Sequence, residues 1–239
     1  MISKNYIFKP IGNKLEFIGD FESLYKNEDD PWSQSGDVGE IRHYYEHSRA
    51  ELTNKLKEIN PDSLLEIGCG LGYTTKIIQK SLPSCSVKGM DISKEAISRA
   101  RKLFPDLDFV SGDIRSIYSS SYKKYDVIIL NQLLWYVLES LSKTFENCFS
   151  LLDSGGRIII SQAFLRTSQK YGKDICDGFD GLMSFLKDRK FDIEYFKLDN
   201  SNSLLHNDGL IVFKKELQYN NSRKEKDAGS NPVSDQRAA

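Results

Sequence analysis

The 239-residue chain lacks several features that would assign it to a class at once. It carries no strong net charge, because 33 basic and 34 acidic residues leave a formal charge of −1. Without a positive field it has little to hold a phosphate backbone, so we expect no nucleic-acid partner. No apolar run approaches the ~20 residues that cross a bilayer, and the N-terminus has no signal-peptide core. We therefore expect a cytoplasmic protein with no membrane partner.

Cysteine and histidine are also scarce. The four cysteines form no Cys-x-x-Cys pair and no even framework, which is typical of free thiols in a reducing compartment. Two of the three histidines, His43 and His47, have the i, i+4 spacing of one helix face. A zinc site needs at least a third suitable ligand nearby, so we expect no metal.

The most informative segment that is present is Leu64–Gly72, in which an apolar run leads to Glu66 and then to glycines at alternate positions. This order predicts a buried strand, a tight turn and a helix behind it. Glycine permits backbone angles closed to other residues and lets a ligand lie on the main chain. Glu66 is poorly placed for a phosphate but can attract the ammonium group of an amino-acid-bearing cofactor. The expected cofactor residues here are Glu66, Gly68, Cys69, Gly70 and Gly72.

The glycine spacing separates two candidate cofactors. A dinucleotide-binding turn has the pattern Gly-x-Gly-x-x-Gly. In this chain the third position of that pattern is Tyr73, and the third glycine stands one place earlier, at Gly72. A nicotinamide-dependent oxidoreductase is therefore disfavoured and stays as an alternative.

Two later segments end in polar residues suited to a nucleoside. The predicted strand at 86–91 ends in Asp91, followed by Ile92, 25 residues after Glu66. In a strand-helix-strand unit an acid near this position reaches the two ribose hydroxyls, and a carboxylate accepts two hydrogen bonds at once. A buried central strand at 125–131 then ends at Asn131 and Gln132, at the edge where open α/β sheets bind ligands.

Taken in order, these segments resemble the class I S-adenosylmethionine-dependent methyltransferases, with Leu64–Gly72 as their first motif. The resemblance covers about residues 60–163, and residues 164–216 by topology. It implies S-adenosylmethionine as cofactor, with Asp113 facing the exocyclic amine of adenine and Ile114 packing on the ring. It also implies that Arg49, which precedes the glycine turn, pairs with the carboxylate of the cofactor.

The predicted fold is α/β, a Rossmann-like seven-stranded mostly parallel sheet with helices on both faces, an antiparallel last strand and an N-terminal helical addition. We expect strands near 63–67, 86–91, 108–111, 125–131, 156–162, 191–198 and 208–215. Helices are expected near 40–59, 71–82, 93–103, 138–152 and 178–190, with a short helical piece at 115–121. Residues 1–20 are predicted to form an extended arm, and residues 153–156 a turn before the fifth strand.

These elements suggest three regions. Residues 1–59 are expected to form an N-terminal arm and a helical cap over the active site. Residues 60–217 are expected to form the methyltransferase domain, and residues 218–239 a disordered polar tail. We expect a monomer or a homodimer.

The acceptor is less defined than the methyl donor. Segments 30–32, 44–49 and 65–70 resemble the nodulation-protein-S group, which N-methylates an amino sugar. That resemblance implies a small polar acceptor, such as the amine of an amino sugar or another saccharide-type metabolite, and it places Trp32 beside the cofactor. Aromatic rings can cage a cation or stack on a sugar. The expected substrate-pocket residues are Tyr25, Tyr44, Tyr45, His47, Trp135 and Tyr136.

The chemistry leaves the catalytic residue unassigned. The methyl carbon of a sulfonium is already electrophilic, and much of the acceleration can come from positioning the nucleophile. No fixed catalytic motif is needed. An O-methyltransferase acting on a small metabolite and a non-catalytic S-adenosylmethionine-binding module therefore remain as alternatives.

Overall fold

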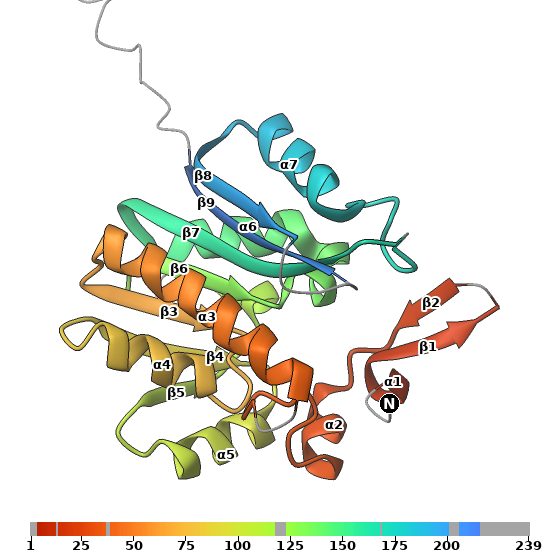
Figure 1. Ribbon diagram of the computed structural model, residues 1–239, viewed down its shortest axis with the longest axis horizontal. Helices are drawn as coiled ribbons and strands as arrows, with labels where there is room; N and C mark the ends of the chain where they lie inside the picture. Colours follow the sequence, from red (N-terminus) through yellow and green to blue (C-terminus); the bar gives the residue numbers. More distant parts are fainter. Residues whose placement is uncertain are drawn as a thin grey trace, which may run out of the picture.

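The computed structural model describes residues 4–12, 14–36, 39–117, 123–167, 169–200 and 206–215. The main sheet contains β3 Ser63–Ile67, β4 Ser86–Asp91, β5 Asp108–Ser111, β6 Tyr125–Asn131, β7 Leu152–Leu165, β8 Phe191–Asp199 and β9 His206–Lys215. The strand order is β5-β4-β3-β6-β7-β9-β8 (Figure 1). β9 runs antiparallel to β7 and β8, and the other neighbours are parallel. The predicted Rossmann-like sheet is confirmed.

Helices alternate with these strands along the chain. They are α2 Phe21–Asn27, α3 Gly39–Ile59, α4 Tyr73–Ser81, α5 Lys94–Leu103, α6 Leu141–Leu151 and α7 Gly178–Asp188. Among the described residues, the 3-10 turn η1 Ile114–Ser116 follows β5, and the 3-10 turns η3 Leu134–Tyr136 and η4 Leu138–Ser140 connect β6 to α6. Within the described ranges, no helix is both long and apolar enough to cross a membrane.

The sheet is covered on both faces, which explains its nearly continuous apolar strands. Along β6, Val127 and Ile129 point into a core shared with α3 and α4, whereas Ile128 and Leu130 point into a core shared with α6 and α7. All four side chains are fully buried. This packing holds the carboxyl ends of β3, β4 and β6 along one rim of the sheet.

The N-terminal region differs from the predicted extended arm. It folds as a short helix, α1 Lys4–Ile7, and a hairpin of β1 Phe8–Ile11 and β2 Lys14–Phe17, which lies apart from the main sheet (Figure 1). Phe8 and Phe17 share ring contacts with each other and with Tyr171. These contacts join residues far apart in sequence, which explains why local pattern did not reveal the hairpin.

The start of β7 also differs from prediction. The expected turn at 153–156 is included in the strand, although Gly155 keeps the positive φ of 78° that is typical of a turn. The register to β6 shifts between Tyr125 and Val127, so this strand begins with an irregularity. The short helical piece predicted at 115–121 is seen only as η1 up to Ser116. Residues 118–122 and the predicted disordered tail lie outside the described residues.

Candidate functional site

The glycine turn after β3 has backbone angles that only glycine adopts readily. Gly68, Gly70 and Gly72 have φ values of 77°, 55° and 82°, in the left-handed region that L side chains rarely occupy. A Cβ at Gly70 would lie 2.5 Å from Oε1 of Gln34 and 2.6 Å from the hydroxyl of Tyr25. The turn therefore needs glycine both for its angles and for the close approach of the N-terminal segment.

Glu66 and Cys69 lie beneath the cavity, outside its lining. Glu66 is 1% exposed, and its Oε2 accepts a hydrogen bond of 2.5 Å from Thr75 Oγ1. Asn131 Nδ2 donates to its other oxygen at 3.3 Å. Burial raises the pKa of Glu66 to about 7 despite these donors. Burial likewise raises the pKa of the Cys69 thiol, so this cysteine is a packing residue rather than a nucleophile.

Arg49, on α3, is buried against the same turn. Its Nε donates to Thr74 Oγ1 at 3.1 Å and its Nη2 to the carbonyl of Gln34 at 2.7 Å. The guanidinium lies 4.4 Å from the centre of the Tyr45 ring. In this arrangement Arg49 ties the N-terminal segment to the start of α4.

Asp91 stands at the end of β4 and lines a cavity. Its Oδ2 accepts from the Gly70 amide at 2.8 Å, and its Oδ1 accepts from the Ser93 amide at 2.9 Å. Burial raises the pKa of Asp91 to about 6. The carboxylate keeps free lone pairs for hydroxyl donors from a ligand.

Asp113 follows β5 and carries a forked ion pair. Arg115 donates to it from Nε, at 2.9 and 3.0 Å, and from Nη2 at 2.8 Å. Burial alone would raise the pKa of Asp113, but these hydrogen bonds outweigh it and hold the pKa below its usual range. The charge of Arg115 is therefore largely neutralised by its neighbour.

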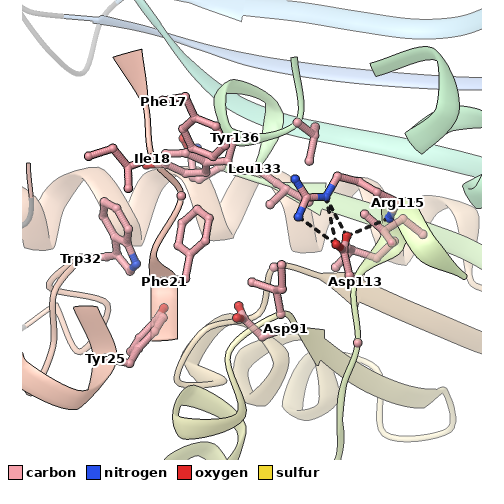
Figure 2. Close-up of a pocket in the computed structure, with 18 of the residues that line it drawn as sticks. Phe17, Ile18, Phe21, Tyr25, Trp32, Asp91, Asp113, Arg115, Leu133 and Tyr136 are labelled. Atoms are coloured by element: carbon pink, nitrogen blue, oxygen red, sulfur yellow. Dashed lines mark hydrogen bonds and ion pairs between the residues drawn. The ribbon is translucent and has the colours of Figure 1, made fainter. Parts of the chain in front are cut away.

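The cavity has a volume of about 180 Å³ and lies between the sheet rim and the N-terminal segment. Figure 2 shows Phe17, Ile18, Phe21 and Trp32 gathered around Tyr136, with Asp91 and Asp113 on the side of the sheet. The ring centroids of Phe21 and Trp32 lie 5.3 and 5.6 Å from that of Tyr136. The expected site residues that line it are Tyr25, Trp32, Gly68, Asp91, Ile92, Asp113, Ile114, Gln132 and Tyr136. A largely aromatic chamber thus closes over two carboxylates.

The structure places four expected substrate-pocket residues outside this cavity. Tyr45 donates to the carbonyl of Trp32 at 2.8 Å and supports it from behind. Trp135 donates to the carbonyl of Ala163 at 3.1 Å and packs into the core. Tyr44 stacks edge-on against His206, and His47 lies 3.5 Å from Asp199 in a separate small hollow. Gly70, Gly72, Asn131 and Arg49 likewise support the lining without forming part of it.

Several lining residues were missed by sequence reasoning. They are Phe17, Ile18, Phe21, Gln34, Arg115 and Leu133. Gln34 accepts from the Leu71 amide at 2.9 Å, a contact across 37 positions with no local signal. Phe17 and Phe21 belong to the N-terminal region, which is rich in aromatic residues. That enrichment is the sequence signal that could have predicted them as lining residues.

The strand order, together with the acidic residues near the ends of β3, β4 and β5, defines a class I S-adenosylmethionine-dependent methyltransferase fold. Residues 60–220 match the family model described as a methyltransferase domain. The chain belongs to this methyltransferase family.

Curated relatives match over a shorter span. Malonyl-[acyl-carrier protein] O-methyltransferase of Halalkalibacterium halodurans is 32% identical over 106 residues, which cover 42% of this chain and 39% of that protein. Trans-aconitate 2-methyltransferase of Escherichia coli is 30% identical over 110 residues, covering 46% and 42%. The chain thus spans about two fifths of the length of these relatives.

A solved structure matches over a longer span. The N-methyltransferase NodS from Bradyrhizobium japonicum WM9, in complex with S-adenosyl-L-homocysteine, aligns with a TM-score of 0.63 at 20% identity. The alignment covers 82% of this chain and 98% of NodS. At this identity the likeness shows the fold alone.

Proposed function

We propose that this protein transfers a methyl group from S-adenosylmethionine to a small polar acceptor that is neutral or cationic, such as the amine of an amino sugar. The observation that carries the proposal is the charge of the chamber. Its charged lining residues, within the described ranges, are Asp91, Asp113 and Arg115, and Arg115 is bound to Asp113. Because Arg115 is engaged, the described lining offers no unpaired cation to an acid, and its aromatic rings suit a neutral or cationic acceptor.

The residues fit the cofactor that the family uses. Asp91 is buried with free lone pairs at the chamber wall, where ribose hydroxyls can donate to it. Asp113 and Ile114 provide an acceptor and an apolar surface for a purine. Glu66 and Arg49 lie outside the lining and are held by partners of their own, so they support the glycine turn on which the cofactor would lie. When bound, S-adenosylmethionine supplies an electrophilic methyl carbon. Aromatic faces such as that of Tyr136 favour the positive charge of its sulfonium.

The chain's own contribution is positioning and exclusion of water. We propose that residues 1–59 act as a cap, with Phe17, Phe21 and Trp32 as its inner face. In the described part of the lining there is no histidine, lysine or cysteine, and His43 is largely exposed. An amine acceptor would therefore react as its free base, and the rate would follow the ionisation of the acceptor itself.

The carboxylate acceptors named in the two curated relatives are disfavoured here. A carboxylate normally needs an unpaired arginine or lysine in its pocket, and Arg115 is engaged by Asp113. NodS is an N-methyltransferase, and a nitrogen acceptor has no such requirement. This contrast favours N-methylation of an amine over esterification of an acid.

The test has two arms. Calorimetric titration should show binding of S-adenosylmethionine by the intact protein. An assay for released S-adenosylhomocysteine should then show turnover with D-glucosamine and related hydroxylated amines, and none with malonate esters or trans-aconitate. Turnover of the acids alone would contradict the proposed acceptor class. Binding of the cofactor without turnover of any acceptor would favour the non-catalytic module.

A further inference from the structure

Gln132, the first residue after β6, has an unusual backbone. Its φ is 54°, a left-handed value that is uncommon for residues other than glycine and asparagine. Its amide donates to the carbonyl of Ser161 on β7 at 2.8 Å. Non-glycine residues persist in this region where their surroundings hold them, and they cluster at functional sites. In this conformation the Gln132 side chain reaches Gln162 and Ala163 on β7.

The orientation of the Gln132 amide is set by backbone groups. The Ala163 N–H donates to Gln132 Oε1 at 3.0 Å, and a backbone N–H can only meet the oxygen of a side-chain amide. Gln162 Nε2 donates to the same oxygen at 3.2 Å. Gln162 is itself oriented, because its Oε1 accepts from the Leu134 amide at 2.9 Å. Neither amide can flip without losing a bond to the main chain.

The consequence is an unpaired donor at the chamber. Gln132 Nε2 is buried and has no hydrogen-bond partner among the described residues, while Gln132 lines the cavity. A buried polar group without a partner is unfavourable, and such groups in native proteins usually have a role. Ala163 and Gln162 hold the oxygen end, so the N–H that stays unpaired is available to an oxygen that a ligand brings.

The position separates this donor from the cofactor groups. Asp91 and Asp113 follow β4 and β5, on one side of β3. Gln132 follows β6, and its amide is fixed to β7, on the other side. Ligands in such sheets bind across the point where the strand order reverses. The nucleoside groups therefore lie toward β4 and β5, and the β6–β7 side is left for the second substrate.

On the basis of the proposed function, we infer that Gln132 Nε2 donates a hydrogen bond to an uncharged oxygen of the acceptor, such as a hydroxyl. Gln162 is a positioning residue that holds this donor in place. An uncharged amide donor matches an uncharged oxygen, whereas an acid would call for a cation. The acceptor class then becomes a hydroxylated amine, which is the chemistry of an amino sugar.

The experiment compares two amines that differ in their oxygens, D-glucosamine and cyclohexylamine. Turnover is followed by release of S-adenosylhomocysteine, and cofactor affinity by calorimetry. Gln132→Met removes the donor. Gln132→Glu keeps an oxygen for Ala163 and replaces the donor with a second oxygen. Both should lower kcat/KM for glucosamine at least about tenfold more than they lower kcat/KM for cyclohexylamine, and any change in S-adenosylmethionine affinity should be well below tenfold.

Gln162→Met tests the positioning role. It should raise KM for glucosamine more than it lowers kcat, because the donor is present but no longer held. The matched control is Gln79→Met on α4, whose amide donates to the carbonyls of Leu82 and Cys85 away from the chamber. This control should leave the ratio of the two amines unchanged.

The outcomes separate the inference from the proposed function. An equal loss for both amines, or no loss for either, overturns the role of Gln132 and leaves methyl transfer standing. A tenfold fall in cofactor affinity in Gln132→Met assigns the donor to the cofactor and also overturns it. Cofactor binding with no turnover of any amine by the wild-type protein overturns the proposed function, and the inference with it.

Discussion

Thr75 on α4 donates a hydrogen bond of 2.5 Å to Oε2 of Glu66 at the end of β3. Both side chains are fully buried, so the contact joins strand and helix across the glycine turn. A carboxylate in this setting is destabilised by loss of water, and its donors only partly offset that loss. Burial accordingly raises the pKa of Glu66 to about 7.

The raised pKa makes stability depend on pH in a defined direction. The folded state binds the Glu66 proton more tightly than the unfolded chain, whose ordinary value is 4.5. The contribution of this proton to the free energy of unfolding is complete below about pH 4.5. It is lost as the pH rises to about 7, and the loss is roughly 3 kcal/mol in all. Glu66→Gln should remove this decline and be the more stable protein at pH 8. Urea unfolding between pH 5 and 8 measures it, and parallel curves for the two proteins would contradict the assignment.

Asp91 should govern cofactor affinity. Asp91→Asn keeps the shape of the side chain but removes the charge that strengthens hydrogen bonds from hydroxyls. We expect S-adenosylmethionine to bind at least about tenfold more weakly. Because burial raises the pKa of Asp91 to about 6, the affinity of the wild-type protein should also fall as the pH drops below that value. Asp108→Asn is the control, since Asp108 is exposed beside Lys88. Equal affinities of the two variants would exclude Asp91 from the site.

The sheet could be predicted because its signals are local. Most of the parallel strands are apolar runs followed by a polar residue or a glycine, and Ser93 caps α5 by accepting from the Ala96 amide at 3.1 Å. Glu66 and Asp91, near the ends of β3 and β4, could be singled out for the same reason, whereas Asp113 after β5 was singled out through the family resemblance. Because these strands are parallel neighbours, their carboxyl ends meet at one edge of the sheet whatever the conformation of the loops.

The roof of the chamber could not be predicted in the same way. Trp135 and Tyr136 are adjacent in the sequence, yet only Tyr136 lines the cavity, because a single 3-10 turn sends the two rings in different directions. Gln34 and Phe17 reach the site through contacts with residues far along the chain. Such placements depend on tertiary packing, and the hydrophobic periodicity of the sequence does not predict them.

Tyr136 should act through its ring. It touches Phe17, Phe21 and Trp32, and burial raises the pKa of its phenol, which stays neutral. Tyr136→Phe should therefore bind S-adenosylmethionine as the wild type does. Tyr136→Ala should lower affinity about tenfold and destabilise the fold by ~3 kcal/mol or more. Calorimetry and urea unfolding measure the two effects, and a phenylalanine variant as impaired as the alanine one would assign the role to the hydroxyl.

Gly70 offers a test of whether the cap and the glycine turn act together. Gly70→Ala should strain the backbone, because φ is 55°, and should displace Gln34 and Tyr25, which lie within 2.6 Å of the added carbon. Gly155 is the matched control: its φ is 78°, and nothing lies within 4 Å of an added Cβ. Gly155→Ala should therefore lose only the conformational term, about 1–2 kcal/mol, with cofactor affinity unchanged.

Gly70→Ala should lose more stability than this control and bind S-adenosylmethionine at least about tenfold more weakly, because the displaced cap no longer closes the chamber. Urea unfolding of both variants, with calorimetry on each, separates the two contributions. If both variants lose the same stability and bind the cofactor equally well, the contact of Gln34 and Tyr25 with the turn has no part in the site. A loss of affinity confined to Gly70→Ala places the cap on the glycine turn as a component of cofactor binding.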